Sequence, residues 1–475
     1  MPSALLDQIM AAAAFAPLNP APTFSGADPV FPLALRIGEA GAAAIAATGV
    51  AAAELWRLRT GRTQSVHVAV DAAAAAMRGN QYLRREQEGG GDAPLAAAGR
   101  IPGAGGGIYR TGDGRWIYLH GGFEHHRARI RKLLQCEEDA ESMARAVAGW
   151  KAAALEDAVF SHGACGGVIR TEAEWLRGEQ GQAIAGLPLL EVLRAGDSRP
   201  EPLPQAARPL SGIRVLDLTR VLAGPTCART LAEHGAEVLR VGTDRLPNNE
   251  SQTIDTGHGK RSTVLDLANP SGIEQLKALI RDADVFSQSY RPGSLASRGF
   301  SLDAVMALRP GIIYVTLSAF SHAGPWRDRR GFDTLVQAVS GIADEYALDG
   351  RPRLYPVSAL DYITGYLAAF GVMVALGRRA REGGSYHVRV SLAQTGRWLT
   401  AQGRIAPERV AAAPADLTPE RLAALSTTSD SPFGRLRHLA PVVQMSETPA
   451  RWERPAVPLD HDEPRWLDEE RGTRK

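Results

Sequence analysis

The regular alternation of apolar strands and helical segments between residues 212 and 320 constrains the fold more than any other feature of this sequence. The sequence predicts a buried strand at 212–220, GIRVLDLTR, and further strands at 236–242, 284–290 and 311–320. Helical patterns occur between them in TCARTLAEHG, SGIEQLKALIRDA and SLDAVMALRP. Strands connected by helices of this length form a mostly parallel sheet with crossover helices. The sequence therefore predicts an α/β fold in which a Rossmann-like large domain contains a mostly parallel sheet.

The length of the chain indicates more than one domain, because 475 residues exceed what one hydrophobic core usually serves. The Pro-rich segment 197–212 is the predicted linker, and a hairpin turning at GDG is expected within 108–121. The predicted organisation is, in chain order, a helix-and-strand segment resembling the end of a large domain at 1–80, a smaller α+β domain at 81–196, the linker at 197–212, the Rossmann-like domain at 213–400 and an extended tail at 401–475.

Composition excludes several classes of function. The 54 Lys and Arg and 52 Asp and Glu residues leave a net charge of +2, which argues against a dedicated nucleic-acid or membrane-surface protein. Cys136, Cys165 and Cys227 are scattered without metal-ligand spacing, so we expect reduced cysteines in a cytoplasmic protein. The N-terminus lacks the basic region of a signal peptide. The Ala-rich run 40–55 is shorter than a membrane span of roughly 20 residues and predicts a buried helix.

An internal repeat relates two distant parts of the chain. Residues 39–71 resemble residues 361–391, since both contain GVxxA, a basic cluster, a glycine turn and a VxV strand. In this register Glu39 corresponds to Asp361.

Asp361 lies in the stretch PVSALDYITGYLAAFGVMVAL, where it precedes what the sequence predicts to be a long buried helix. From the residues alone two interpretations stay open. Asp is a common helix N-cap residue, so the side chain would be structural. Alternatively, a helix N-terminus would keep the carboxylate ionised, and small neighbours would leave room for a substrate carbonyl.

Basic residues lie beside predicted strand ends in GHGKRSTVLDL, at 257–267, and in SYRPGSLASRGF, at 289–300. Arginine forks match phosphate oxygens, and ligands of open α/β sheets bind beyond the carboxyl ends of the strands. Solvated surface charge is an equally good interpretation of each basic residue in so Arg-rich a chain. The first strand–helix unit, 214–241, lacks GxGxxG, so no dinucleotide site is predicted there.

Five separated segments together resemble the family III CoA-transferases, the CaiB/BaiF family of formyl-CoA and carnitine CoA-transferases. These segments are LSGIRVLDLTRVLAGP, GKRSTVLDL, YRPGSLASRGF, GPWRDRRGFDTLVQAVSG and SALDYITGYLAAFGVMVAL. Their order and spacing resemble the family over about residues 210–400, and GGGIYRTGDGRWIYL and GGVIRTEAEW resemble parts of its small domain. Because the small-domain-like part comes first, the chain looks like a permuted member or two fused partial copies.

The resemblance implies an enzyme in which Asp361 is the nucleophile and carries CoA as an aspartyl-CoA thioester. It also implies an acyl-CoA donor and a carboxylic acid acceptor as substrates, no cofactor other than the CoA thioester substrate, no metal, and a homodimer, interlocked in other members. Position by position, it assigns CoA binding to Leu222, Ala223, Leu265, Asp266, Tyr290, Arg291, Arg298 and Arg330. The Gly-rich lid that would supply oxyanion donors is expected at Gly105, Gly106 and Gly107.

Two other functions stay open on this fold. A 2-methylacyl-CoA racemase must remove and return an α-proton, and that branch resembles a GHD motif where this chain has Gly331, Phe332 and Asp333. Phe332 cannot accept a proton, which disfavours the racemase. A non-catalytic acyl-CoA-binding protein would explain the permuted order and two departures from the family pattern, Thr243 in place of a basic residue and the displaced Arg298.

Two further features receive structural interpretations. Glu39 is interpreted as a relic or a helix cap, because its longer side chain would displace the carboxylate beyond the tolerance of a catalytic site. His125 and His126 predict a solvated helix face rather than a metal site.

Overall fold

The computed structural model describes residues 1–16, 19–87, 92–95 and 106–467. At its centre lies a seven-stranded sheet in the order β11-β10-β9-β12-β13-β14-β8. Neighbouring strands are parallel except β14 and β8, which are antiparallel. The strands are β8 (Leu190–Gly196), β9 (Arg214–Asp217), β10 (Glu237–Gly242), β11 (Lys260–Val264), β12 (Val285–Gln288), β13 (Ile313–Ser318) and β14 (Ser385–Ser391). The predicted Rossmann-like, mostly parallel sheet is thereby confirmed.

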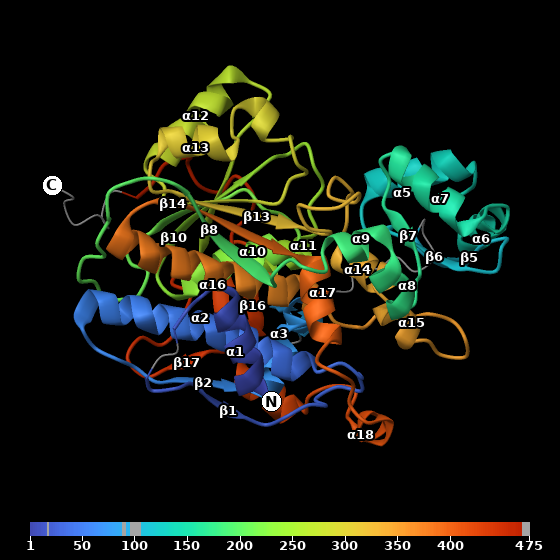
Figure 1. The fold of residues 1–475 in the computed structure, drawn as a ribbon, viewed down its shortest axis with the longest axis horizontal. Helices are drawn as coiled ribbons and strands as arrows, with labels where there is room; N and C mark the ends of the chain where they lie inside the picture. Colours follow the sequence, from blue (N-terminus) through green and yellow to red (C-terminus); the bar gives the residue numbers. More distant parts are fainter. Residues whose placement is uncertain (17–18, 88–91, 96–105, 468–475) are drawn as a thin grey trace.

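Helices cover both faces of this sheet (Figure 1). α12 (Pro270–Arg281) and α13 (Leu302–Leu308) lie on one face, and α10 (Ala223–Glu233) and α16 (Ala359–Glu382) lie on the other. Successive strand residues point to opposite faces, so Leu216 and Val215 enter two different hydrophobic clusters. Strands buried on both faces tend to be apolar, as β13 is with the sequence IYVTLS, whereas β11, KRSTV, is mostly polar.

The two long helices of the internal repeat pack against each other. α2 (Ile37–Thr60) and α16 each have 24 residues and contact one another along the large hydrophobic core. Each is followed by a glycine, a strand and another helix, α3 (Val70–Ala76) after α2 and α17 (Leu392–Thr400) after α16. The Ala-rich run predicted to be a buried helix lies within α2 and is buried.

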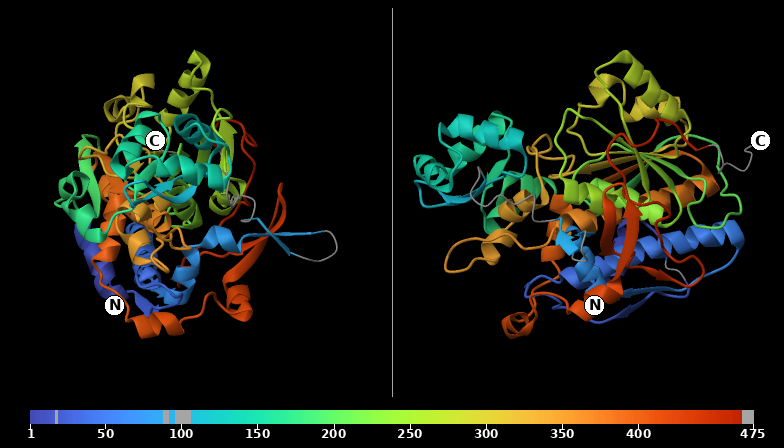
Figure 2. Two further views of the ribbon diagram at one scale, coloured as in Figure 1. Left: turned by 90° about the vertical axis from the view of Figure 1, so that its right-hand side faces the viewer. Right: turned by 180° about the vertical axis from the view of Figure 1, so that it is seen from behind.

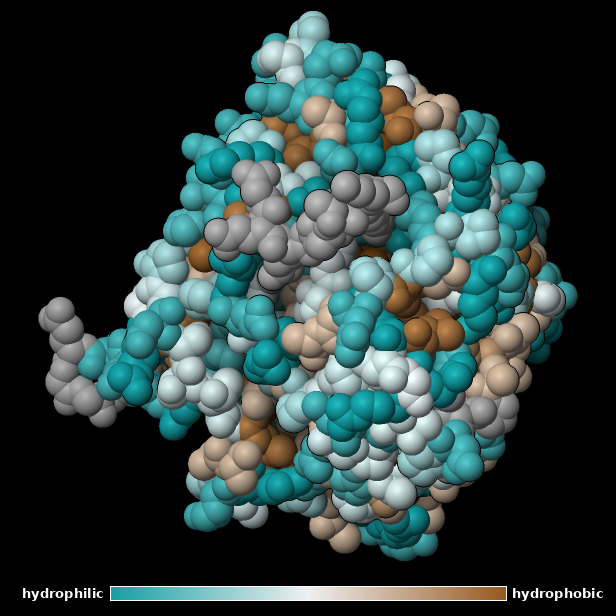
Figure 3. Space-filling model, turned by 90° about the vertical axis from the view of Figure 1, so that its left-hand side faces the viewer, coloured by the Kyte–Doolittle hydropathy of each residue, from teal (hydrophilic) through white to brown (hydrophobic). Residues whose placement is uncertain are grey.

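Helix α16 has the length and mean hydropathy of a membrane span, and that whole window is buried inside the protein. The face of the molecule in Figure 3 is covered mainly by hydrophilic side chains, with small hydrophobic groups scattered between them.

The smaller domain stands at one end of the molecule and has a core of its own (Figures 1 and 2). Its three-stranded sheet has the order β5-β6-β7. β5 and β6 form the antiparallel hairpin expected within 108–121. The elements of this part are β5 (Gly107–Arg110), β6 (Trp116–Leu119), α5 (Glu124–Leu134), α6 (Ala140–Ala148), α7 (Ala152–Ser161), β7 (Gly166–Val168), α8 (Glu172–Arg177) and α9 (Glu179–Ala183).

The remaining elements surround the large sheet and the two long helices. They are α1 (Pro2–Ala12), β1 (Thr23–Ser25), β2 (Val66–Ala69), α4 (Gly79–Tyr82), β3 (Arg84–Glu86), β4 (Asp92–Pro94), α11 (Glu250–Gly257), the 3₁₀ turn Ala296–Arg298, α14 (Asp333–Val339), α15 (Ile342–Glu345), α18 (Pro407–Ala412), α19 (Pro419–Leu425), β15 (Ser426–Ser431), β16 (Gly434–Leu439) and β17 (Gln444–Met445).

The structure corrects the predicted organisation at two places. β8 falls inside the expected small domain, 81–196, yet it forms the edge of the large sheet. The described part of the expected extended tail, 401–467, contains two helices and three strands, and β15 and β16 join β3 and β4 in a sheet that projects from the body (Figure 2). Only its later part matches an extended chain, where Asp462 accepts a hydrogen bond from the backbone of Ser262 on β11.

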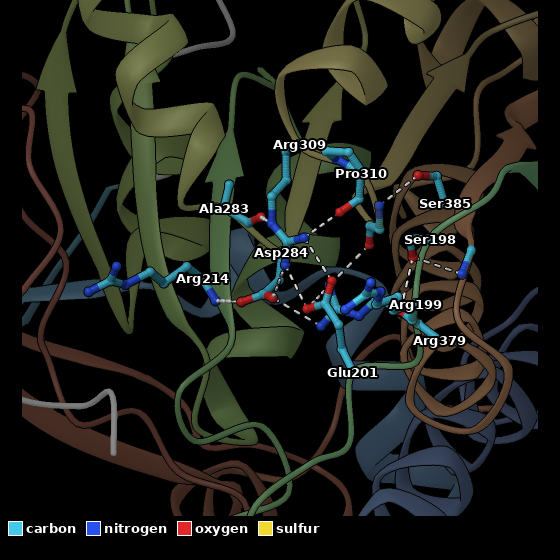
Figure 4. A network of polar contacts seen from close by, with 12 residues as sticks. Ser198, Arg199, Glu201, Arg214, Ala283, Asp284, Arg309, Pro310, Arg379 and Ser385 are labelled. Atoms are coloured by element: carbon cyan, nitrogen blue, oxygen red, sulfur yellow. Dashed lines mark hydrogen bonds and ion pairs between the residues drawn. The ribbon is translucent and has the colours of Figure 1, made fainter. Parts of the chain in front are cut away.

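A buried polar network fixes the far end of α16 (Figure 4). Arg379, 1% exposed, donates to Asp284, 0% exposed, at 2.9 Å. Asp284 also accepts from the backbone N–H of Arg214 at 2.9 Å. Arg309 binds both carboxylate oxygens of Glu201 in the linker at 2.7 Å. The network therefore joins the linker, the sheet and the C-terminal turn of α16.

Breaking this network should destabilise the fold. Arg379→Met leaves the Asp284 carboxylate buried without its closest cation, so we expect the free energy of unfolding to fall by about 3 kcal/mol. Arg381→Met on the same helix is the matched control. Arg381 pairs with Glu54, and its side chain is 46% exposed, so losing this ion pair should lower the free energy of unfolding by at most about 1 kcal/mol. Urea unfolding would measure both, and equal losses would contradict the importance of the network.

Candidate active site

A cleft of about 560 Å³ opens between the smaller domain and the carboxyl ends of the sheet strands. Leu218, Leu265, Ser289 and Ser318 line it at or just beyond the ends of β9, β11, β12 and β13. The smaller domain contributes Phe123 and the first turns of α5. Ligands of parallel α/β sheets bind at this edge, which makes the cleft the candidate active site.

The cleft brings together most of the residues predicted from the sequence. Eight of them line it: Ala223, Leu265, Asp266, Tyr290, Arg291, Arg298, Arg330 and Asp361. Leu222 does not, because it is 1% exposed and packs in the hydrophobic core. Gly105 lies outside the described residues. Gly106 lies beside Gly121 and Gly107 begins β5, and neither lines the cleft.

Asp361 lies in the first turn of α16 and is 6% exposed. Its backbone N–H donates to the Asp333 carboxylate at 3.0 Å, so a side chain from α14 satisfies the helix N-terminus. Among the described residues, no group donates a hydrogen bond to the Asp361 carboxylate. The capping interpretation of Asp361 is therefore wrong, because Asp333 performs that role and leaves the Asp361 carboxylate free toward the cleft.

The two carboxylates disfavour ionisation of each other. Burial raises the pKa of Asp361 well above 3.8, and the nearby charge of Asp333 raises it further. Burial also raises the pKa of Asp333 to about 6, although hydrogen bonds from the Asp361 backbone and the Gln337 side chain oppose this rise. Asp333 is held in place by this bonding, since Gln337 also accepts from the backbone of Tyr355.

The other half of the repeat contains a similar arrangement without a cleft. Asp28 accepts hydrogen bonds from the backbone of Gly38 at 3.2 Å and of Glu39 at 2.7 Å, as Asp333 does from Asp361. Each capping Asp is the third residue of a GxD sequence, GAD in one copy and GFD in the other. Glu39 differs from Asp361 because Arg36 binds its carboxylate at 3.0 Å and because it does not line the cleft.

The cleft is rich in arginine. Arg220, Arg291, Arg298 and Arg330 line it, and none of them forms an ion pair with a carboxylate of the described part of the chain. Burial lowers the pKa of Arg220 and of Arg330. Unpaired guanidinium groups around one cavity give it a positive potential that favours anionic ligands.

Two basic residues of the 257–267 segment make structural contacts outside the cleft. Lys260, 2% exposed, binds the buried Asp217 at 2.7 Å. Arg261 donates to the backbone carbonyl of Arg465 in the C-terminal part. Neither lines the cleft, so the phosphate-binding interpretation of this segment is wrong for both.

A cluster of imidazole and phenyl rings from the smaller domain was missed by sequence reasoning. His120 stacks on Phe332 with ring centroids 4.1 Å apart. The His126 ring lies edge-on to Phe332 with centroids 5.7 Å apart. The predicted solvated helix face is wrong, since His126 is 2% exposed and lines the cleft with His125. Burial lowers the pKa of His126 to about 3 and that of His120 to about 4, which keeps both rings neutral. The imidazole rings contact one another within the smaller domain, and Phe332 joins them from the loop before α14, a distant contact that no local pattern signals.

Within the described ranges, no group of three or more His, Cys, Asp or Glu residues is arranged to hold a metal ion.

Comparison with known proteins agrees with this architecture. The sequence model of CoA-transferase family III matches residues 23–186 and 210–419, and the chain therefore belongs to that family. Acetyl-coenzyme A transferase nodX of Hypoxylon pulicicidum is 33% identical over 317 residues, 62% of this chain and 54% of that protein. The succinyl-CoA–L-malate CoA-transferase beta subunit of Chloroflexus aurantiacus is 36% identical over 39% of this chain and 49% of its own length.

Solved structures include similar proteins. A CaiB/BaiF family protein from Brucella suis is 25% identical and covers 48% of this chain and 65% of its own, with a TM-score of 0.38. The chain spans about half the length of the curated relatives it matches.

The raised pKa of Asp361 predicts a pH-dependent effect on stability. An acid with a raised pKa in the folded state stabilises the fold below its unfolded pKa, and this contribution is lost as pH rises through the folded pKa. Asp361→Asn should therefore be more stable than wild type at neutral pH, by about 1.4 kcal/mol for each pH unit between the unfolded pKa and the lower of pH 7 and the folded-state pKa. Below pH 3.8 the two proteins should be equally stable.

Denaturant unfolding at several pH values would measure this difference. Asp7→Asn, at an exposed position on α1, is the matched control, because it makes the same chemical change away from the cleft. A destabilised Asp361→Asn variant at neutral pH would show that the carboxylate is stabilised in the fold, contrary to the geometry.

Proposed function

We propose that this chain transfers CoA between carboxylic acids through an aspartyl-CoA thioester on Asp361. One observation carries the proposal: a buried carboxylate without a hydrogen-bond donor among the described residues faces a cleft surrounded by unpaired arginines. A structural carboxylate in such a place would normally be paired or bonded. A nucleophile needs instead an open approach to the substrate carbonyl.

The chemistry needs only one carboxylate. The ionised Asp361 attacks the thioester carbonyl of the acyl-CoA, which forms a mixed anhydride and releases the CoA thiolate. The thiolate then attacks the aspartyl carbonyl, which forms the aspartyl-CoA thioester and releases the first acid as a carboxylate. An acceptor carboxylate repeats both steps in reverse order and leaves as its CoA thioester. The overall reaction breaks one CoA thioester and forms another, with no change in oxidation state. It therefore requires neither a metal nor a redox cofactor, and CoA enters as part of the substrate.

The cleft fits the two ends of an acyl-CoA. Arg291 and Arg298 lie beyond β12, where the unpaired guanidinium groups suit the phosphates of CoA. Leu265 and Tyr290 offer apolar surface for the nucleotide, and Asp361 lines the same cleft, which supports its assignment to the thioester. We assign Ala223, Asp266 and Arg330 to the same binding surface.

The relatives guide the choice of substrates to test. They are named for succinyl-CoA with malate and for formyl-CoA with oxalate, so small dicarboxylic acids are the first candidates for this chain. We also propose that the chain forms a homodimer. The proposal does not extend to an interlocked topology, because the order of segments is permuted in this chain. Nucleic acid and membranes are not among the proposed partners.

Replacing the nucleophile should abolish transfer. With succinyl-CoA or formyl-CoA as donor and a panel of dicarboxylic acids as acceptors, Asp361→Asn should lower the rate of CoA exchange by about 10³-fold or more. The rate is measured by chromatography of the CoA thioesters. Glu39→Gln is the matched control from the other half of the repeat and should keep most of the activity, provided that its stability is unchanged. Unaltered exchange in Asp361→Asn would refute the proposal.

The fall of kcat/KM at low pH should report the ionisation of Asp361 and Asp333. The nucleophile must be ionised, so kcat/KM should fall as pH decreases through the raised pKa of Asp361. Asp333→Asn keeps an acceptor for the Asp361 backbone but removes the charge that raises the pKa, and should move this fall to lower pH. The two acids titrate as a pair, so the apparent pKa values belong to both. A fall that stays at the same pH would show that Asp333 does not tune the nucleophile.

A second candidate, exchange of the α-proton of a bound acyl-CoA, is favoured by one observation. The imidazoles of His120 and His126 surround Phe332, so the structure brings neutral bases close to the position where the sequence lacks one. Loss of α-deuterium to water without CoA exchange would support this candidate over transfer. CoA exchange with the α-deuterium retained would support transfer.

A further inference from the structure

Three arginines from the two domains meet at the cleft. Arg129 comes from α5 of the smaller domain, Arg291 follows β12, and Arg330 lies in the loop before α14. The family resemblance assigns only the latter two to CoA binding. The smaller domain therefore places a cation of its own beside those of the sheet edge.

A glycine makes room for two of these groups. Arg129 Nη1 donates to the carbonyl oxygen of Gly163 at 2.7 Å. A Cβ atom at Gly163 would lie 3.2 Å from Nη1 of Arg330 and 3.4 Å from Nη1 of Arg129. The two guanidinium groups therefore both lie against Gly163, although their helix and loop belong to different domains.

The cluster has no counter-charge from the described residues. None of the three guanidinium groups forms an ion pair with a carboxylate in the described part of the chain, whereas their neighbour Arg329 pairs with Asp157 at 3.4 Å. Burial, followed by the charges of Arg291 and Arg129, lowers the pKa of Arg330. The same repulsion acts on His125, whose pKa is lowered by burial and by the charges of Arg129, Arg220 and Arg330. A group of like charges at one point is stabilised by an anion bound between them.

We infer that Arg129, Arg291 and Arg330 bind one oxyanionic group of the substrate, which thereby bridges the smaller domain and the sheet. This inference rests on the proposed function, because it assumes an acyl-CoA and an acid in this cleft. Two groups have the required chemistry, the diphosphate of CoA and the second carboxylate of a dicarboxylic acid. Either one would hold α5 against the cleft when it is bound, so that substrate binding and domain closure are coupled.

The test compares Arg129→Gln with Arg145→Gln, a matched control on α6 whose side chain is 66% exposed and pairs with Glu141. Calorimetry with CoA and with pantetheine, which lacks the diphosphate, gives the affinities, and steady-state kinetics gives KM for the acceptor acid. Hydrogen exchange of α5, with and without CoA, follows the closure.

If the diphosphate is the bound group, Arg129→Gln weakens CoA binding by about tenfold or more, leaves pantetheine binding unchanged and removes the CoA-dependent protection of α5. If the carboxylate is the bound group, CoA affinity is unchanged and KM for the dicarboxylic acid rises by about tenfold. If the wild-type protein binds and exchanges CoA but Arg129→Gln matches Arg145→Gln in every readout, the inferred bridge is wrong and the proposed function stands. A wild-type protein that does not bind CoA contradicts the proposed function and the bridge together.

Discussion

The hydrogen bond from the backbone of Asp361 to the carboxylate of Asp333 is the interaction on which the candidate site depends. A helix N-terminus buried in a core must find acceptors for its free N–H groups, and a side chain in the first turn often provides one. Here α14 provides the acceptor from a distant part of the chain. Asp361 is consequently released from the structural role that its position suggests, and its burial becomes a cost to the fold that only a function explains.

The position of Asp361 is also determined at the opposite end of α16. Arg379 ties the last turns of the helix to Asp284 and, with Arg309 and Glu201, to the linker (Figure 4). Between these two ends the helix is buried against the sheet and against α2. A nucleophile needs placement to within a fraction of an ångström, and a helix held at both ends supplies it. In the other half of the repeat, Glu39 occupies the corresponding position, and its carboxylate forms an ion pair with Arg36.

Much of this arrangement follows from local sequence patterns. The mostly apolar segment GIIYVTLSAF at 311–320 predicted β13, because a strand buried on both faces is rich in apolar residues. The placement of Arg291 and Arg298 at the cleft followed from the rule that ligands bind at strand ends, together with the family resemblance. Local patterns failed where distant segments decide the environment. His126 was predicted to be solvated, but the rings of His120 and Phe123 surround it. Arg261 was predicted to be available for phosphate, but it binds the C-terminal part. The capping role of Asp333 depends on a contact across 28 residues, which no helix or strand period encodes.

Covalent capture of CoA tests the central claim most directly. The purified protein is mixed with succinyl-CoA, quenched in acid and analysed by intact mass spectrometry, and a second sample is treated with hydroxylamine before peptide mapping. The account predicts an added mass of CoA in the wild-type protein, a hydroxamate on the peptide that contains Asp361, and neither in Asp361→Asn. A protein that binds acyl-CoA thioesters and exchanges CoA while Asp361 stays unmodified, or one modified at another residue, would contradict it.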